Sequence, residues 1–90
     1  MDLLAFLKSL PDDDARADFA QRCDSSINHV RNVSYGKTCA PWLAVAMERE
    51  SAGVVTCEES CPDVSWHRVR DPLWPDRRGR PLLDLAAAAA

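Results

Sequence analysis

Apolar residues recur at spacings of three and four positions through the first sixty residues, which is the periodicity of amphipathic helices. The first stripe consists of Leu3, Leu4, Leu7 and Leu10. It predicts a helix over residues 2 to 10, with Asp2 as a cap for its first backbone amides. Pro11 ends this helix, because the residue before a proline is disfavoured in the helical region.

Residues 15 to 37 have the pattern of two short helices joined by a tight turn. Their apolar faces consist of Ala15, Phe19 and Cys23 in the first helix and of Ile27, Val30 and Val33 in the second. The aspartates at residues 12 to 14 suit the start of the first helix, where carboxylates interact favourably with the helix dipole. Asp24 is expected in the left-handed conformation of the turn, which Asp adopts more readily than most residues. Ser25 or Ser26 then caps the second helix.

The outward face of the second helix, residues 26 to 34, is polar and free of acids. It carries Asn28, His29, Arg31 and Asn32. Two short helices in which the second presents hydrogen-bonding side chains have the layout of a DNA-binding helix-turn-helix. The sequence therefore predicts that residues 26 to 34 enter the major groove, and the competing interpretation is a solvated helix surface.

A longer helix is expected from Cys39 to about Glu50. Gly36 supplies a left-handed stop before it, Thr38 is the expected N-cap, and Pro41 falls in the first turn, where a missing N–H costs little. The expected buried residues are Trp42, Leu43, Val45, Ala46 and Met47. The expected exposed residues are Glu48, Arg49 and Glu50.

The remaining chain predicts one more short helix and a tail. Thr56 and Glu59 form a capping-box pattern, and Pro62 ends the helix that follows it. Trp66 and Val69 are expected to cover the open edge of the core. The resulting organisation is a helix-turn-helix DNA-binding domain over residues 1 to 70. A flexible tail rich in Pro, Arg and Ala is expected over residues 71 to 90.

The distribution of charge is more informative than the formal net charge of -3, which does not indicate nucleic-acid binding. Residues 2 to 24 carry six acids and three bases, whereas residues 25 to 47 carry Arg31 and Lys37 and no acid. A local positive face on an acidic protein predicts modest, salt-sensitive affinity for phosphates. A chance acid-free window is the alternative explanation.

Other classes of function receive little support from the residues. The four cysteines, Cys23, Cys39, Cys57 and Cys61, include no Cys-x-x-Cys pair, and His29 and His67 have no metal-ligand spacing with them. We expect four structural thiols, no metal, no cofactor and no enzymatic activity. No apolar run reaches the roughly 20 residues of a membrane helix, and Lys8 and Pro11 interrupt the first one, so a soluble, cytoplasmic protein is expected.

Several segments resemble the YdaS-like antitoxin family, which comprises Cro-type regulators of prophage origin. They are Leu3 to Leu10, Phe19 to Cys23, Ala44 to Ser51, Val55 to Glu59 and Pro62 to Trp66. The resemblance covers about residues 1 to 70 and implies an all-α, lambda-repressor-like fold of about five short helices. It also implies operator binding in the bacterial nucleoid and a repressor or antitoxin role beside a partner gene. Asp24 departs from the family pattern, in which Gly is usual.

Together these observations predict a sequence-specific transcriptional regulator that binds double-stranded DNA. The expected DNA-binding residues are Ser25, Ser26, Asn28, His29, Arg31, Asn32, Lys37 and Thr38. Asn can pair with an adenine edge, Arg with guanine or a phosphate, and hydroxyls and backbone amides with phosphates. One such helix covers few base pairs, so a homodimer or higher homo-oligomer on a pseudo-palindromic operator is expected. The alternative is a small helical module that binds a toxin or a transcription-factor partner.

Overall fold

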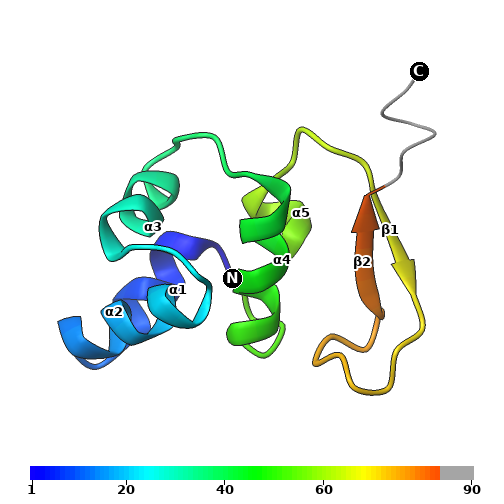
Figure 1. Ribbon diagram of the computed structural model, residues 1–90, viewed down its shortest axis with the longest axis horizontal. Helices are drawn as coiled ribbons and strands as arrows, with labels where there is room; N and C mark the ends of the chain where they lie inside the picture. The colour runs from blue at the N-terminus through cyan, green and yellow to red at the C-terminus, as the bar shows by residue number, and fades with distance from the viewer. Residues whose placement is uncertain (84–90) are drawn as a thin grey trace.

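The structure, a computed structural model, describes residues 1 to 83, which form five helices and one two-stranded antiparallel sheet (Figure 1). The helices are α1 (Leu3–Ser9), α2 (Asp13–Arg22), α3 (Ile27–Ser34), α4 (Pro41–Glu50) and α5 (Cys57–Ser60). The strands are β1 (Trp66–Val69) and β2 (Arg80–Leu83). The fold is mostly helical, as the hydrophobic periodicity predicted, but the all-α prediction is wrong because the chain ends its described part in a hairpin. None of the helices in residues 1 to 83 has the length and apolar character needed to cross a membrane.

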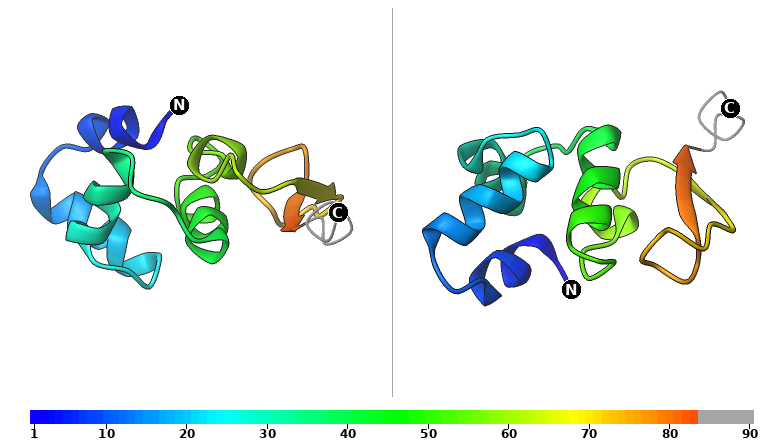
Figure 2. Two further views of the ribbon diagram at one scale, coloured as in Figure 1. Left: turned by 90° about the horizontal axis from the view of Figure 1, so that it is seen from above. Right: turned by 60° about the horizontal axis from the view of Figure 1, so that its bottom comes forward.

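The helices enclose an apolar core. Its fully buried side chains include Phe19, Val30, Leu43, Met47 and Val55. The rings of Phe6 and Phe19 meet edge to face, with centroids 4.9 Å apart, which joins α1 to α2. Figure 2 shows α1, α2 and α3 gathered on one side of α4, with the hairpin on the other side. Helix α4 is therefore the element that connects the two ends of the molecule.

Three helices end in the same way, with a residue of positive φ just after the cap. Asp24 (φ 56°), Gly36 (φ 109°) and Ala52 (φ 56°) follow α2, α3 and α4 respectively. Beside each, paired backbone bonds close the last turn, such as Ser25 N–H to Ala20 O at 2.9 Å. The predicted left-handed conformations of Asp24 and Gly36 are confirmed. Ala52 was not foreseen, because alanine usually avoids this region.

The start of α4 and the burial of its residues differ from expectation. The helix begins at Pro41 with Ala40 as N-cap, and no side chain caps it, so Thr38 is not its N-cap. Trp42 is 55% exposed although it was expected in the core, and Val45 is only half-buried. Glu48 is fully buried although it was expected on the surface. The buried face of α4 therefore includes a carboxylate.

Glu48 is buried because the hairpin supplies its partners. Arg68 of β1 approaches it through two bonds of 2.6 Å, one to each carboxylate oxygen. Trp74 donates its indole N–H to Glu48 Oε2 at 2.6 Å, and the Cys57 amide donates to Oε1 at 3.1 Å. A buried carboxylate needs this kind of charged and hydrogen-bonded company. Arg68 also contacts Glu58 at 2.8 Å, so the network ties α4, α5 and the hairpin together.

The flexible tail expected from residue 71 is not found in residues 71 to 83. Strand β2 pairs with β1 in a register that places Trp66 opposite Leu83 and Arg68 opposite Pro81. Gly79 (φ 100°) permits the return, since a Cβ there would lie 2.2 Å from the Val69 carbonyl oxygen. The boundary expected at residue 70 falls between two strands of one hairpin. The rest of the expected tail, residues 84 to 90, lies outside the described residues.

Candidate nucleic-acid interface

Helix α3 is held firmly against the core by its apolar side. Val30 and Val33 are buried, and Ile27 packs against the core from the edge. Ser26 is the N-cap, and its side-chain oxygen accepts a hydrogen bond from the His29 amide at 3.1 Å. The prediction that Ser25 or Ser26 caps this helix is therefore confirmed. The opposite side of α3 is therefore presented in a fixed orientation at one end of the molecule (Figure 1).

The eight predicted DNA-binding residues do not share one degree of exposure. The exposed ones are Ser26, Asn28, Asn32, Lys37 and Thr38. The half-buried ones are Ser25, His29 and Arg31. Asn28 and Asn32 thus lie four residues apart on the exposed side of α3, and Ser26 is exposed at the start of the helix. Lys37 and Thr38 follow in the link to α4.

Arg31 is engaged within the protein. Its guanidinium contacts Asp13 of α2 at 3.2 Å, and the same carboxylate oxygen contacts Arg16 at 3.0 Å. Asp13 lies outside residues 25 to 47 in sequence but close to them in space. It therefore offsets part of the positive charge of this acid-free segment. Exposed pairs of this kind are weak, so Arg31 can leave Asp13 at small cost.

Arg22, at the end of α2, also has a structural role. It pairs with Asp18 at 3.0 Å and reaches the Glu50 carbonyl at 3.4 Å, while its guanidinium carbon lies 5.9 Å from the centre of the Phe19 ring. These contacts close α2 over the core. Residues 25 to 47 contain two bases, and Arg31 is paired with Asp13. Lys37 is exposed and has no carboxylate within ion-pair distance among residues 1 to 83.

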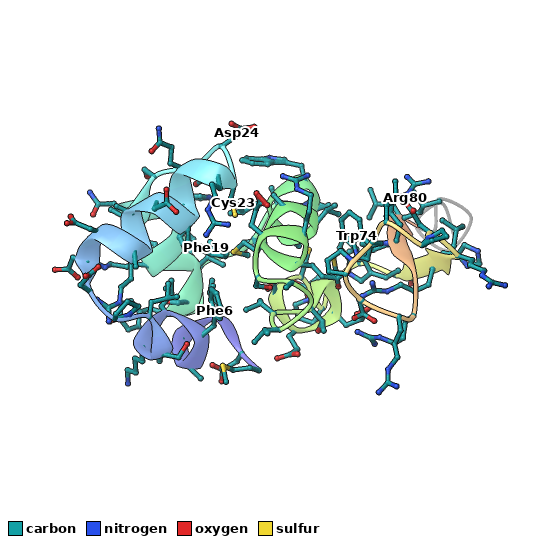
Figure 3. The ribbon with its side chains drawn as sticks, turned by 90° about the horizontal axis from the view of Figure 1, so that it is seen from below. Phe6, Phe19, Cys23, Asp24, Trp74 and Arg80 are labelled. Atoms are coloured by element: carbon teal, nitrogen blue, oxygen red, sulfur yellow. The ribbon has the colours of Figure 1, made fainter. Side chains whose placement is uncertain are left out.

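Positive charge is concentrated at the opposite end of the molecule. Residues 1 to 65 carry eleven acids and six bases, whereas residues 66 to 83 carry five arginines and two aspartates. Figure 3 shows Arg80 at the hairpin end and Trp74 between the hairpin and the helices. The exposed side of α3 is polar, and the hairpin is the region in which bases outnumber acids.

The four cysteines are buried and have free thiols. Burial raises the pKa of Cys23 and of Cys39 to about 11, and it also raises the pKa of Cys57 and Cys61. Cys61 donates a hydrogen bond from its thiol to the Cys39 carbonyl at 3.2 Å. Such thiols are poor nucleophiles, because the thiolate is the reactive form. Within residues 1 to 83, no three His, Cys, Asp or Glu side chains gather as ligands for a metal ion.

The Glu48 network was missed by sequence reasoning, although one signal was present. Glu48 lies four residues after the buried Ala44, so helical spacing places both on the same, inner face of α4. Burial alone would raise the pKa of Glu48. Hydrogen bonds from Arg68, Trp74 and the Cys57 amide outweigh this effect and hold that pKa below its ordinary value. The partner that makes this burial possible is twenty positions away and gives no local signal.

No family model, no curated protein and no solved structure matches this chain.

Proposed function

We propose that the protein is a sequence-specific regulator of transcription that binds double-stranded DNA, with residues 26 to 34 in the major groove. The observation that carries the proposal is the arrangement of α2 and α3. A short turn with Asp24 in the left-handed conformation joins them, and α3 presents Asn28 and Asn32 one helical turn apart on its exposed side. We interpret α2 and α3 as a helix-turn-helix, a motif in which the second helix contacts base edges. Membership of the YdaS-like antitoxin family, with a Cro-type repressor or antitoxin role, belongs to the same proposal.

The side chains divide into two roles. Asn28 and Asn32 read bases, since a carboxamide can donate and accept at an adenine edge. Ser25, Ser26, Lys37 and Thr38 contact phosphates and fix the register of the helix on the duplex. Arg31 joins the phosphate contacts after it leaves Asp13, and His29 contributes more strongly when protonated.

Binding is expected to require two copies of the chain. One helix of eight residues spans few base pairs, so useful affinity calls for a homodimer on half-sites about one helical turn apart. The helical part of the protein carries more acids than bases, and this further weakens a single copy on DNA.

The test is a mobility-shift titration of the protein on the DNA upstream of its own gene, at low and physiological salt. Asn28→Ala and Asn32→Ala should each lower the preference for that DNA over unrelated DNA by about 1–3 kcal/mol, or roughly 5- to 150-fold. Ser65→Ala, which removes an exposed polar group far from α3 in the chain, is the matched control and should change nothing. If no sequence preference is seen at either salt with micromolar protein, the proposal is wrong.

A protein-interaction module is the second candidate, and one surface favours it. A shallow groove of about 540 Å³ is lined by Pro41, Trp42, Val45, Trp66, Pro81, Leu82 and Leu83. Trp42, Leu82 and Leu83 are all exposed apolar residues. Apolar surface of this kind often marks a protein contact, such as one with a toxin or a transcription factor. Retention of a cognate partner by the wild type but not by Trp42→Ser, together with no DNA shift, would favour this candidate.

A further inference from the structure

We propose that the loop of the hairpin, residues 70 to 79, is a second nucleic-acid contact that binds the phosphate backbone without reading its sequence. The inference rests on the proposed DNA-binding function and adds a surface that the helix-turn-helix does not include. Three observations support it: hydrogen bonds order the loop, two of its arginines have no carboxylate partner among residues 1 to 83, and it exposes Leu73.

The loop is ordered by hydrogen bonds of its own. Asp71 Oδ1 accepts from the Leu73 amide at 3.0 Å, and the Trp74 amide donates to the Asp71 carbonyl at 3.0 Å. Asp76 Oδ1 accepts from the Arg78 amide at 2.8 Å. The Trp74 indole is bonded to buried Glu48, which fixes the middle of the loop to α4. A loop that is already ordered loses little conformational entropy when it binds.

Both acids of the hairpin are already paired with arginines. Asp76 pairs with Arg78 at 2.9 Å, and Asp71 pairs with Arg80 at 3.3 Å. Arg68 is committed to Glu48 and Glu58. This leaves Arg70 and Arg77, both exposed, without a carboxylate partner among residues 1 to 83. These two guanidinium groups are therefore available to a partner of negative charge.

The loop also exposes a large apolar side chain beside its arginines. Leu73 is 93% exposed, and Pro72 and Pro75 flank the Leu73–Trp74 pair. Exposed apolar side chains with neighbouring arginines are typical of proteins that hold the minor groove, where Leu or Pro presses between base steps. The combination therefore favours a nucleic acid.

The charge of the rest of the molecule strengthens this assignment. Residues 1 to 65 carry more acids than bases, whereas residues 66 to 83 carry more bases than acids, so a polyanion is attracted more strongly to the hairpin. A duplex that approaches the protein is thus steered first to the loop.

The test measures binding of the whole protein to a short duplex of arbitrary sequence, followed by fluorescence anisotropy between about 50 and 200 mM salt. The double variant Arg70→Ala with Arg77→Ala should lower the slope of log K against log salt by about two, since each phosphate contact contributes about 0.9. Affinity at the low-salt end should fall about tenfold or more. Arg70→Lys with Arg77→Lys should keep the slope, because the charge is retained.

Matched variants separate the loop from a general loss of charge. Lys8→Ala with Arg49→Ala removes the same charge from exposed helical positions and should leave the slope unchanged. Leu73→Ala should weaken binding a few-fold without a change of slope, because an apolar contact releases no counterions. Asn28→Ala with Asn32→Ala should also leave this slope unchanged, because the duplex holds no operator. Loss of the specific shift with those asparagine variants therefore reports on the proposed function alone.

Four outcomes would overturn the inference. They are no binding of the wild type at low salt, wild-type binding by the double arginine variant, an equal loss in the Lys8 and Arg49 control, and competition by poly-glutamate as effective as by duplex at equal charge. The last outcome would mean that the loop recognises an acidic protein surface. Urea unfolding of each variant verifies that it is folded, and any variant with a lowered midpoint is compared at a temperature where it is fully folded.

Discussion

The helical part of the molecule and the hairpin are stabilised by different physics. In the helices, side chains such as Phe19, Leu43 and Met47 are removed completely from water, and the hydrophobic effect supplies most of the stability. In the hairpin, Pro81 and Gly79 are the buried residues, and a charged network around Glu48 attaches it to α4. The comparison teaches that a region with little core of its own can still be ordered, provided its neighbour offers a buried charge to pair with.

The largest expected effect comes from cutting the link between the two regions. Glu48→Ala leaves Arg68 without its closest partner and removes the acceptor of Trp74, so the free energy of unfolding should fall by about 3–5 kcal/mol. Glu50→Ala removes a neighbouring, partly exposed acid and should cost less than about 1 kcal/mol. Urea denaturation of both variants measures the difference. Equal losses would mean that the network does not hold the hairpin.

A second prediction compares two glycines of similar φ, one in each region. Gly79→Ala places a Cβ 2.2 Å from the Val69 oxygen and should cost about 2–4 kcal/mol, because strain and clash add. Gly36→Ala meets nothing within 4 Å and should cost only the strain of about 1–2 kcal/mol. Thermal unfolding measures the loss of stability in each variant. A larger loss for Gly36→Ala than for Gly79→Ala would show that Gly79 does not lie against the Val69 carbonyl.

Acid should weaken the attachment of the hairpin in preference to the core. The pKa of Glu48 is lower in the folded protein than in the unfolded chain, so its contribution to stability is full above its unfolded pKa of about 4.3 and is lost as the pH falls through the folded value. Urea midpoints from pH 7 to pH 3 should therefore fall less steeply for Glu48→Gln than for the wild type. Parallel curves would assign the acid sensitivity to other carboxylates.

The smallest expected effect concerns the start of α3. Ser26→Ala removes the acceptor of the His29 amide and should cost about 1 kcal/mol. Ser65→Ala, at an exposed position that joins α5 to β1, should cost a few tenths at most. Chemical denaturation measures this difference, provided that the dependence of the unfolding free energy on denaturant concentration is the same for both variants. A loss at Ser65 as large as that at Ser26 would mean that the cap is not a significant source of stability.

The helices could be predicted because their signals are local. Leu3 and Leu7, or Val30 and Val33, repeat at helical spacing, and both Asp24 and Gly36 occupy turns that suit their backbone preferences. The N-cap at Thr38 was wrong because Pro41 already suits the first position of a helix that needs no side-chain cap. Propensity alone does not choose between two such starts.

The hairpin could not be predicted in the same way. Strand β1, Trp-His-Arg-Val, has no alternation of apolar and polar residues, and β2 contains Pro81. Their order depends on Arg68 meeting Glu48, a contact between residues twenty positions apart. For the candidate site, the exposed asparagines of α3 were foreseen, but the pairing of Arg31 with Asp13 and the basic loop at residues 70 to 79 required the fold.

The four buried thiols give the molecule its own set of reporters. Cys23 ends α2, Cys39 lies between α3 and α4, and Cys57 and Cys61 bound α5, so together they sense the opening of three segments. A thiol reagent can modify such a residue only when its segment has opened, in the manner of amide hydrogen exchange. The rates of modification at the four positions would rank the local stabilities along the chain without any engineered label.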